Sequence, residues 1–564
     1  MDIKTIDEAL SVSPQIQLED IHEIAKIGFK SIICNRPDGE GSDQPTVTEI
    51  KNAAEKLNIS VHYLPITQGK VRDEDAEAFT KLLDGLSSPT LAYCRTGTRS
   101  TTLWALSQSA KGKDLHSILE ITKAAGYNMS GVIRRIANGG QTPTEEGDAS
   151  HDIVIIGGGS GGIAAASSLL KRDKNLDICI IDPADTHYYQ PGWTMVGGGI
   201  FNAKQTAKPL AALIPKGVHW IKAAASAFEP ENNAVILDGC RVIKYKQLIV
   251  APGLKLNWNA IEGLVETLGK NGVTSNYRYD LAPYTWELVK SLKSGRALFT
   301  QPPMPIKCAG APQKAMYLSS DHWFKEQVLN NIDIEFYNAG GVLFGVKDYV
   351  PALMNYVEKY NIDTRFTHNL VRIDGPSKTA WFNKTDSDGN GELIETTFDM
   401  IHVVPPQTTP DFIRVSPLVD EAGWVDIDPK TLRHKTYENI WSIGDVMNAP
   451  NAKTAAAVRK QAPIVANNLL AVMNQNKSNA KNKNCRMAHY DGYGSCPLTV
   501  ERGKIVLAEF GYGGVLLPSF PEWALDGKKP SRAAWFLKES MLPPIYWKAM
   551  LRGKEWMAKP EIIG

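Results

Sequence analysis

The 564-residue sequence has no uninterrupted apolar run of about 18 residues, the least that a membrane-spanning helix needs. It also has almost no net charge, because 62 Lys and Arg residues balance 61 Asp and Glu residues to leave +1. That balance argues against a nucleic-acid partner. Residues 1–12 are acidic where a secretory leader would be basic and then apolar, so we expect no signal peptide. These absences favour a large intracellular globular enzyme.

Cysteines are few and scattered. None forms a C-x-x-C pair, and their spacing lacks the density of a disulfide framework. The sequence therefore argues against a zinc module or a disulfide-rich secreted domain, and we expect no bound metal. The seven positions are Cys34, Cys94, Cys179, Cys240, Cys308, Cys485 and Cys496.

Four regions follow from the pattern of apolar runs and turn formers. Residues 1–137 alternate short apolar runs with helix-like segments, which is typical of an α/β unit. Residues 138–150 hold turn formers and charge without periodic apolar residues, which indicates a linker. A second alternation of strands and helices fills residues 151–485, and residues 486–564 end in a stretch rich in Trp, Met, Pro and Lys. The fold class is therefore α/β.

A glycine-rich turn gives the strongest signal in the chain. The apolar strand Ile153–Ile156 runs into Gly157-x-Gly159-x-x-Gly162, with Ser160 inside the turn and a small-residue helix after it. Glycines at this spacing let backbone amides and the helix N-terminus approach a pyrophosphate. The pattern predicts a dinucleotide site.

A second strand supports this interpretation. Ile178–Ile181 is apolar and ends in Asp182, which lies 20 residues past Gly162, where a ribose-binding carboxylate belongs. Two later segments favour FAD over NAD. Leu248–Gly253 resembles the strand and turn that return to the dinucleotide in flavoproteins with two dinucleotide-binding domains. Ile440–Asp445, with Gly444 and Asp445 at its end, resembles the second FAD motif of those proteins.

The sequence lacks the second glycine-rich turn that would bind NAD(P)H. The strand Ala297–Thr300 is followed by the proline-rich segment Gln301–Pro312, and prolines cannot offer the amide nest that a pyrophosphate needs. We therefore expect the reductant to reach the flavin through Cys308 in that segment. The neighbouring cation Lys307 and a flavin would lower the pKa of this thiol and make it a nucleophile.

From residue 151 onward the chain resembles sulfide:quinone oxidoreductases of the kind also found in mitochondria. The resemblance implies FAD, oxidation of sulfide to persulfide or polysulfide sulfur, and delivery of electrons to a membrane quinone. The matching stretches are Gly157–Gly162, His187–Thr194, Lys307–Lys314, Lys453–Ala457 and Tyr490–Pro497.

The chain departs from this family at one position. The resemblance implies two redox cysteines beside the flavin, and Cys308 stands where the first belongs. In many members the second follows the Gly-Asp of the second FAD motif, where this chain has Val446. Three alternatives remain open: another thiol such as Cys496 substitutes, a single cysteine suffices, or the substrate is a persulfide and not sulfide.

Lys453 and the small residues Thr454–Ala457 are expected to open a helix whose N-terminus points at the N1–O2 edge of the flavin. A helix dipole and a lysine there would stabilise the anionic reduced flavin. We therefore count Lys453 as a catalytic candidate.

The N-terminal unit contains its own thiol loop. The segment Pro89–Trp104 predicts a strand, a tight loop and a helix, with Cys94 at the end of the strand and Arg99 after four intervening residues. Amides at the helix N-terminus would cradle an anion above the thiol. The loop resembles both the protein tyrosine phosphatase loop and the shorter rhodanese loop. The unit as a whole resembles the phosphatase-like domain of beta-lactamase hydrolase-like proteins. We favour sulfur carriage over phosphate hydrolysis, with an inert structural domain as the third alternative.

The tail predicts contact with a membrane. Residues 528–564 carry eight basic and three acidic side chains, a net charge of +5, interleaved with aromatic and apolar residues. Such composition without spanning length is typical of an interfacial, monotopic anchor that would also admit a quinone. Deleting residues 530–564 is expected to release the protein from membranes and leave its reaction with sulfide intact.

Together these features predict an FAD oxidoreductase that takes electrons from sulfide or a persulfide and reduces quinone, fused to a sulfur-carrying thiol domain. It would sit peripherally on a membrane, which we expect to be the cytoplasmic membrane of a bacterium. The alternative is an NAD(P)H-dependent FAD dehydrogenase fused to a phosphatase-like domain. A phosphatase or signalling protein with a redox-sensing flavin half stays as a third hypothesis, and the sequence leaves homo-oligomers open.

Overall fold

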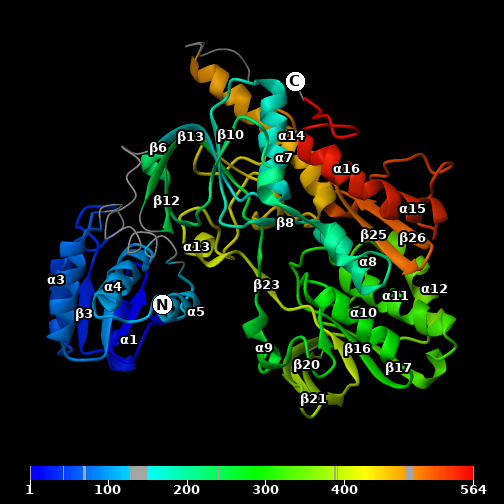
Figure 1. Cartoon of the computed structure of the whole chain (residues 1–564), viewed down its shortest axis with the longest axis horizontal. Helices are drawn as coiled ribbons and strands as arrows, with labels where there is room; N and C mark the ends of the chain where they lie inside the picture. The colour runs from blue at the N-terminus through cyan, green and yellow to red at the C-terminus, as the bar shows by residue number, and fades with distance from the viewer. Residues whose placement is uncertain are drawn as a thin grey trace.

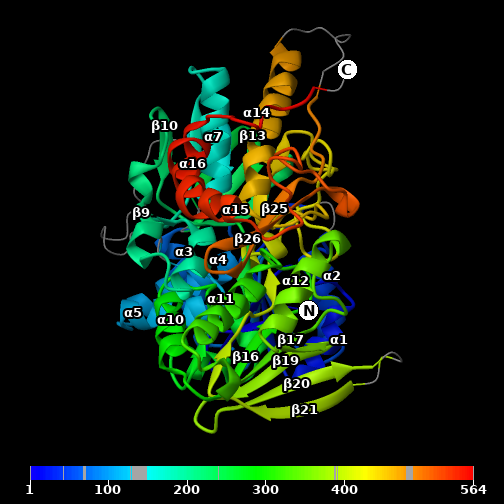
Figure 2. The ribbon, with the colours of Figure 1, turned by 90° about the vertical axis from the view of Figure 1, so that its right-hand side faces the viewer.

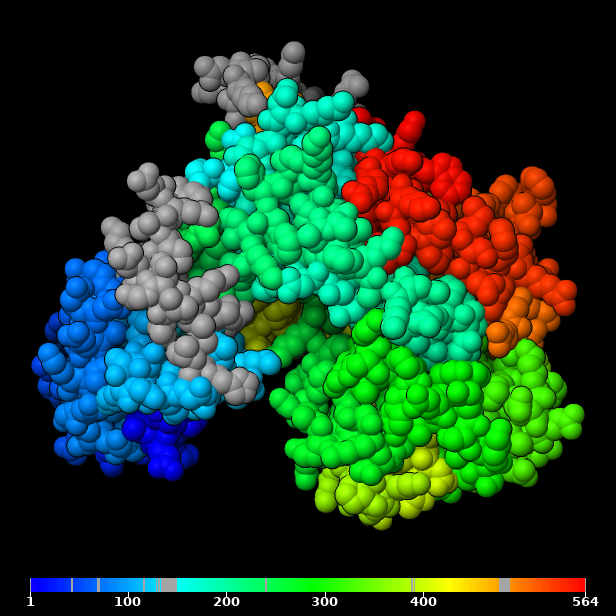
Figure 3. All heavy atoms as spheres, in the orientation of Figure 1, coloured from blue at the N-terminus to red at the C-terminus, as the bar shows by residue number. Residues whose placement is uncertain are grey.

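The computed structural model describes residues 2–562, apart from 42–43, 68–70, 128, 130–131, 133–148, 239–240, 387–388, 390 and 478–486. The predicted linker falls almost wholly outside the described residues. The N-terminal unit lies to one side of the remaining chain (Figure 1). An open gap separates it from much of the body (Figure 3).

The N-terminal unit is a five-stranded sheet flanked by helices. Its strand order is β1-β2-β5-β3-β4, with β1 and β2 antiparallel and the other neighbours parallel. All four residues of each of β2, β3 and β5 are buried, because helices cover both faces of the sheet. The strands are β1 (Lys4–Thr5), β2 (Leu10–Ser13), β3 (Ser31–Cys34), β4 (Ser60–Tyr63) and β5 (Thr90–Tyr93). The helices include α1 (Asp20–Ile27), α2 (Val47–Glu55), α3 (Asp73–Asp84), α4 (Thr98–Ala110) and α5 (Leu115–Ala124).

The glycine-rich turn belongs to a second sheet, with the order β10-β7-β6-β13-β12-β11 and β24 paired to β13. Parallel pairing joins β10, β7, β6, β13 and β24. Helices α7 (Ser160–Arg172) and α14 (Ala455–Lys477) rise beside one another over this sheet (Figure 2). The strands are β6 (Ala149–Ile156), β7 (Ile178–Ile181), β10 (Val218–Ile221), β11 (Ala225–Glu229), β12 (Ala234–Leu237), β13 (Val242–Val250) and β24 (Ile440–Ser442).

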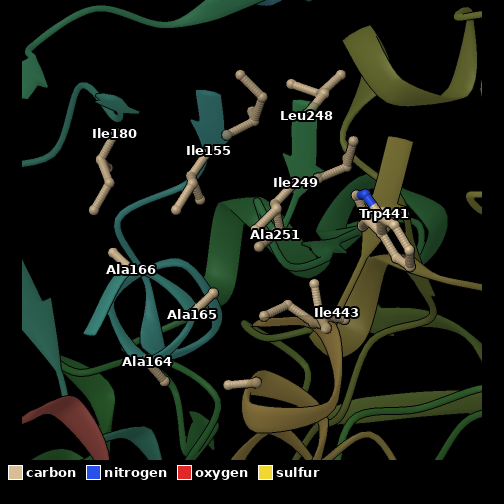
Figure 4. Close-up of a cluster of buried hydrophobic side chains, with 14 of the residues drawn as sticks. Ile155, Ala164, Ala165, Ala166, Ile180, Leu248, Ile249, Ala251, Trp441 and Ile443 are labelled. Carbon is tan, nitrogen blue, oxygen red and sulfur yellow. The ribbon is translucent and has the colours of Figure 1, made fainter. Parts of the chain in front are cut away.

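Small residues let α7 approach this sheet closely. Ala164, Ala165 and Ala166 are almost completely buried. Figure 4 shows them on one side of the cluster, below Ile155 of β6, with Trp441 of β24 on the far side. This packing places the start of α7 directly at the carboxyl ends of the strands, which is where ligands bind in open α/β sheets.

A second parallel unit follows in the chain. Its five strands take the order β15-β22-β16-β17-β18, and an antiparallel meander β19-β20-β21 packs beside it. The predicted strand Ala297–Thr300 lies within β16. The parallel strands are β15 (Val273–Thr274), β16 (Gly295–Gln301), β17 (Ile332–Asn338), β18 (Asp363–Phe366) and β22 (Met400–His402). The meander comprises β19 (His368–Asp374), β20 (Thr379–Thr385) and β21 (Gly391–Thr397). The helices of the unit are α10 (Leu281–Ser291), α11 (Ala311–Lys325) and α12 (Val350–Lys359).

The C-terminal region consists of a hairpin and short helices. Strands β25 (Gly494–Glu501) and β26 (Lys504–Phe510) pair antiparallel against α11. Next come α15 (Arg532–Phe536), a π-helical turn Leu537–Met541 and α16 (Leu542–Lys548). Among the described residues, no helix has the length and apolar character needed to cross a bilayer.

Part of the predicted membrane tail is packed against the rest of the protein. Glu555 pairs with Arg172 and with Lys171 on α7, and the Ser167 hydroxyl of α7 donates to the Leu551 carbonyl at 2.9 Å. Leu551 itself is fully buried. These contacts argue against the expectation that deleting residues 530–564 leaves the reaction with sulfide intact, because this segment helps to hold α7.

Candidate active site

The turn after β6 has the backbone of a phosphate-binding loop. Gly157 has a φ of +100°, which favours glycine, and a Cβ on Gly162 would lie 1.9 Å from the Gly157 carbonyl oxygen. By contrast, nothing lies within 4 Å of the position that a Cβ on Gly159 would occupy. The first and last glycines thus make the turn possible, and the middle one leaves room for a ligand.

The other residues predicted to bind the cofactor gather around this loop. Asp182 accepts hydrogen bonds from the amides of Gly158 at 2.6 Å and Ala184 at 2.7 Å, and burial raises the pKa of its carboxyl group. Gly253 has a φ of +76° with open space beside it. Asp445 lies 3.4 Å from the Lys307 ammonium.

A cavity of about 440 Å³ lies between the two nucleotide-binding-type units and the C-terminal helices. Gly253, Asp445 and Lys453 line it, as does Cys308. Several buried polar atoms at its wall have no hydrogen-bond partner among the described residues, which suits a planar heterocycle with polar edges. These atoms are the Trp193 indole nitrogen, the Thr194 hydroxyl and both polar atoms of the Asn276 amide. The residues present therefore fit a flavin.

Two cysteines meet at the edge of this cavity. The Cys308 and Cys496 sulfur atoms are 3.5 Å apart, although 188 residues separate them in the sequence. Cys308 follows β16 and has a φ of +50°, a conformation that non-glycine residues adopt rarely. Cys496 lies on β25 and is buried. Val446, at the position expected for the second cysteine, is buried in the core.

A glycine makes this pairing possible. A Cβ on Gly310 would lie 2.5 Å from the Cys496 sulfur, so only glycine lets β25 approach the loop after Cys308. Of the three alternatives left open by the sequence, the geometry favours Cys496 as the substitute thiol. The one sequence signal for it was its place within the matching stretch Tyr490–Pro497.

The charge of the thiol pair is unequally shared. The hydrogen bond from Cys496 is the largest effect on Cys308. Together with the Lys314 ammonium 3.1 Å away, it holds the pKa of Cys308 well below its ordinary value. The same hydrogen bond, together with burial, raises the pKa of Cys496. Cys308 is therefore a thiolate that accepts a hydrogen bond from a neutral Cys496 thiol.

Lys538 is a second buried cation near the pair, and its position corrects the sequence interpretation, which counted it among the membrane-facing bases. It lies in the π-helical turn, is 5% exposed and donates to the Pro497 carbonyl at 3.5 Å. Burial, helped by the charge of Lys314, lowers the pKa of Lys538 to about 7. Single-turn π-helices often mark functional sites.

Lys453 lines the flavin cavity just before α14 and also binds two backbone carbonyls. Its ammonium group donates to the carbonyls of Asp445 at 2.9 Å and Met447 at 2.7 Å, and burial lowers its pKa to about 8. Helix α14 does start directly after Thr454, as predicted. The lysine holds the loop that carries Asp445, and its backbone carbonyl accepts from the Cys308 amide at 3.1 Å.

A second cavity of about 670 Å³ meets the first at Cys308. Both sulfur atoms belong to residues that line this second cavity, whereas Cys496 does not line the first. The wall of the second cavity includes Gln301, Asn338 and Asn451. The thiol pair can thus be reached from one side while Cys308 faces the flavin cavity on the other.

In the N-terminal unit, the thiol loop has the predicted strand–loop–helix form. Cys94 follows β5 and is 1% exposed. Arg99 does not point into an open cradle: its guanidinium donates to the two Glu40 oxygens at 2.8 and 2.6 Å and to the Ile66 carbonyl at 2.7 Å. Although burial acts against it, Arg99 and Arg36 hold the pKa of Glu40 below its ordinary value. The sequence analysis missed this carboxylate.

Comparison with known proteins gives two families. Residues 2–111 match the phosphatase-like domain of beta-lactamase hydrolase-like proteins, and residues 151–299 match pyridine nucleotide-disulphide oxidoreductases. The mitochondrial sulfide:quinone oxidoreductase of Dictyostelium discoideum is 42% identical over 442 residues, which are 78% of this chain and 94% of that protein. The chain belongs to the sulfide:quinone oxidoreductase family. It is an oxidoreductase that uses a flavin.

Other members and relatives agree. The mitochondrial sulfide:quinone oxidoreductase of Mus musculus is 37% identical over 72% of this chain and 87% of its own length. The crystal structure of the Aquifex aeolicus family member shares the fold, with a TM-score of 0.59 and 19% identity over 72% of this chain and 92% of that one. A beta-lactamase hydrolase-like protein of Agrobacterium fabrum is 32% identical over 130 residues, 23% of this chain and 30% of that protein.

The cation beside the thiolate gives a test of the site. In the reduced enzyme, iodoacetamide should alkylate Cys308 well below the pH at which an ordinary thiol reacts. Lys314→Met should move this alkylation profile to higher pH, because loss of the cation raises the pKa of Cys308. At a fixed pH below that pKa, the rate of alkylation should fall about tenfold for each unit by which the pKa rises. Peptide mass spectrometry measures the modified fraction. Lys325→Met, a surface change on the same helix, is the control, and an unshifted profile in Lys314→Met would contradict the assignment.

Proposed function

We propose that this enzyme oxidises sulfide at the Cys308–Cys496 pair and passes the electrons through FAD to a quinone. The observation that carries the proposal is the 3.5 Å approach of the two sulfur atoms where two cavities meet. Bleaching of the bound flavin by sulfide, dependent on both cysteines, is the test.

The two cysteines have separate tasks. Hydrosulfide attacks the oxidised pair from the 670 Å³ cavity, the S–S bond breaks, and a persulfide remains on Cys496 with a thiolate on Cys308. Cys308 suits the thiolate role, because Lys314 stabilises its negative charge and it lines the flavin cavity. The 670 Å³ cavity that both cysteines line has room for the added sulfur.

The persulfide is then discharged. When sulfide is in excess a second hydrosulfide attacks the outer sulfur and leaves as hydrogen disulfide, and in turnover an acceptor of the thiol class does so and leaves as a persulfide. Either step returns Cys496 to a thiol. Re-forming the disulfide from the two thiols releases two electrons and two protons. FAD, when bound, supplies two-electron chemistry between this dithiol and the quinone. Lys538, with its pKa of about 7, is placed to hold or release a proton beside the pair.

The C-terminal region offers the quinone a membrane-facing route. The flavin cavity is lined there by apolar side chains that include Leu542, Ile545 and Trp556. Aromatic side chains of this region are also exposed, led by Trp523 at 89% and Phe536 at 58%. Exposed aromatics among basic residues support a peripheral position on a bilayer.

Charge placed on this surface should weaken membrane binding. The double variant Trp523→Glu/Phe536→Glu should lose several-fold in the fraction that cosediments with vesicles of phosphatidylglycerol and phosphatidylcholine, because two carboxylates would enter an apolar, anionic interface. Ile27→Glu changes an apolar residue of the N-terminal unit that is about as exposed as Phe536, and this variant should bind as wild type does. Unchanged cosedimentation of the double variant would assign these aromatics to another surface.

For the N-terminal unit we propose that Cys94 carries sulfur. The Glu40 carboxylate already neutralises Arg99, so a phosphate dianion would have to displace it. A sulfur atom attached to Cys94 requires no such exchange. A tethered thiol also acts at high effective concentration, which suits an acceptor for the persulfide on Cys496.

This role predicts a defect in turnover but not in the first reduction. Cys94→Ser should leave sulfide bleaching intact and slow multiple turnover several-fold when no small thiol acceptor or cyanide is added. Mass spectrometry after incubation of the wild type with sulfide and quinone should find labile sulfur on Cys94. If the variant turns over at the wild-type rate and no sulfur is found on Cys94, sulfur carriage is rejected. A phosphatase or structural role would then remain for the N-terminal unit.

A further inference from the structure

The C-terminal helix α16 reaches the phosphate-binding loop through a chain of buried hydrogen bonds. The His187 ring lies 3.2 Å from the Gly158 carbonyl at Nδ1 and 2.6 Å from the Tyr546 hydroxyl at Nε2. The Tyr546 hydroxyl is also hydrogen-bonded to the Ser160 side chain. His187 and Tyr546 are each 5% exposed. Four residues from three distant segments thus share one polar network.

The chemistry of the partners fixes the direction of each bond. A carbonyl oxygen only accepts, so His187 donates its Nδ1 proton to Gly158, and Nε2 must accept from the Tyr546 hydroxyl. Burial lowers the pKa of His187 to about 4 and raises that of Tyr546, so both are neutral at ordinary pH. The tyrosine oxygen can then accept from the Ser160 hydroxyl. Each of the three side chains has a partner, and the chain has no free end.

Both ends of the chain fall on the loop itself, at Gly158 and Ser160, two residues apart. The network therefore closes a ring over the turn between β6 and α7. It engages the Gly158 carbonyl and also the side chain of Ser160, a residue that the sequence predicts to bind the cofactor. The backbone amides at the start of α7 remain available for the diphosphate.

We propose that Tyr546 is a positioning residue for the dinucleotide site: through His187 and Ser160 it holds the loop Gly157–Gly162 in its phosphate-binding conformation, so that α16 sets the affinity for FAD. The inference rests on the proposed use of FAD. Packing agrees with it, because the Tyr546 ring contacts the Tyr189 ring with centroids 4.8 Å apart and Trp547 contacts His187 at 5.7 Å. The last helix of the chain is thereby part of the cofactor site.

The test measures FAD affinity and release, not turnover. Tyr546→Phe keeps the ring and removes the hydroxyl, which leaves His187 Nε2 and Ser160 without their partner. FAD should bind the apoprotein roughly ten- to hundred-fold more weakly, the loss expected for a broken buried hydrogen bond. The rate at which FAD leaves the diluted holoenzyme should rise accordingly. FAD fluorescence, which returns as the cofactor leaves the protein, measures both.

Tyr317→Phe is the matched control. It removes a buried tyrosine hydroxyl that donates to the Leu353 carbonyl at 3.1 Å in the other nucleotide-binding-type unit. Its apoprotein should lose thermal stability to a similar extent but keep wild-type FAD affinity. Equal weakening of FAD binding in both variants would show a general loss of stability and overturn the inference.

A second variant tests whether the residues act as one chain. His187→Leu cuts the same network at the next link, so the double variant His187→Leu/Tyr546→Phe should bind FAD no more weakly than the weaker single variant. Losses that multiply would mean independent contributions and would contradict the proposal. Wild-type apoprotein that takes up no FAD would instead overturn the proposed function. Wild-type affinity in Tyr546→Phe overturns this inference alone.

Discussion

Serine in place of Cys496 should abolish the reduction of the flavin by sulfide as completely as serine in place of Cys308. Either change leaves one sulfur atom at the site, so no disulfide can form for hydrosulfide to open. The rate of flavin bleaching after anaerobic mixing should fall by roughly three orders of magnitude or more, as it does when a nucleophile is removed from other enzymes. Stopped-flow absorbance measures this rate directly.

The control for this experiment is Cys94→Ser, which removes the thiol of the N-terminal unit and should bleach at the wild-type rate. Flavin content and the visible spectrum before mixing should match in all three variants. Normal bleaching in Cys496→Ser would show that Cys308 acts alone, and the proximity of the two sulfur atoms would then be structural.

A chain that ends at Met541 should be colourless. The truncation removes the ion pairs of Glu555 with α7 and the buried Tyr546, Trp547 and Leu551. Each large buried side chain contributes a few kcal/mol, so together they match the total stability of an ordinary domain, about 5–15 kcal/mol. We expect loss of bound flavin and a cooperative unfolding transition at much lower temperature. Absorbance of the purified protein and calorimetry report both.

A chain that ends at Lys559 provides the comparison. It keeps every contact with α7 named here and should retain its flavin. Full flavin content in the chain that ends at Met541 would contradict this role. It would show that the C-terminal helices only attach the protein to a membrane surface, as the sequence predicts.

The dinucleotide loop could be predicted because its physics is local. Three glycines at fixed spacing, an apolar strand before them and Asp182 after the next strand each report on a few neighbouring residues. Cys308 was found in the same way, from prolines that replace a phosphate-binding turn. In the structure Asp182 accepts a hydrogen bond from the Gly158 amide of this loop.

The residues that the sequence analysis missed depend on long-range packing. Cys496 reaches Cys308 only because β25 packs against α11 past Gly310, and no local pattern encodes that approach. Lys538 looked like a membrane-facing cation, since its neighbours are aromatic and basic, yet a π-helical turn directs it inward. Glu40 pairs with Arg99 across 59 residues. Ion pairs between residues that are far apart in the sequence produce no periodic sequence pattern from which they could be predicted.

Anaerobic titration of the purified protein with sulfide, followed at the visible absorbance of the flavin, tests the central claim most directly. The account predicts that sulfide bleaches the flavin in the wild type, that quinone restores the colour, and that Cys308→Ser and Cys496→Ser stay yellow throughout. A flavin that sulfide leaves oxidised and NADH bleaches would contradict the account and identify an NAD(P)H dehydrogenase.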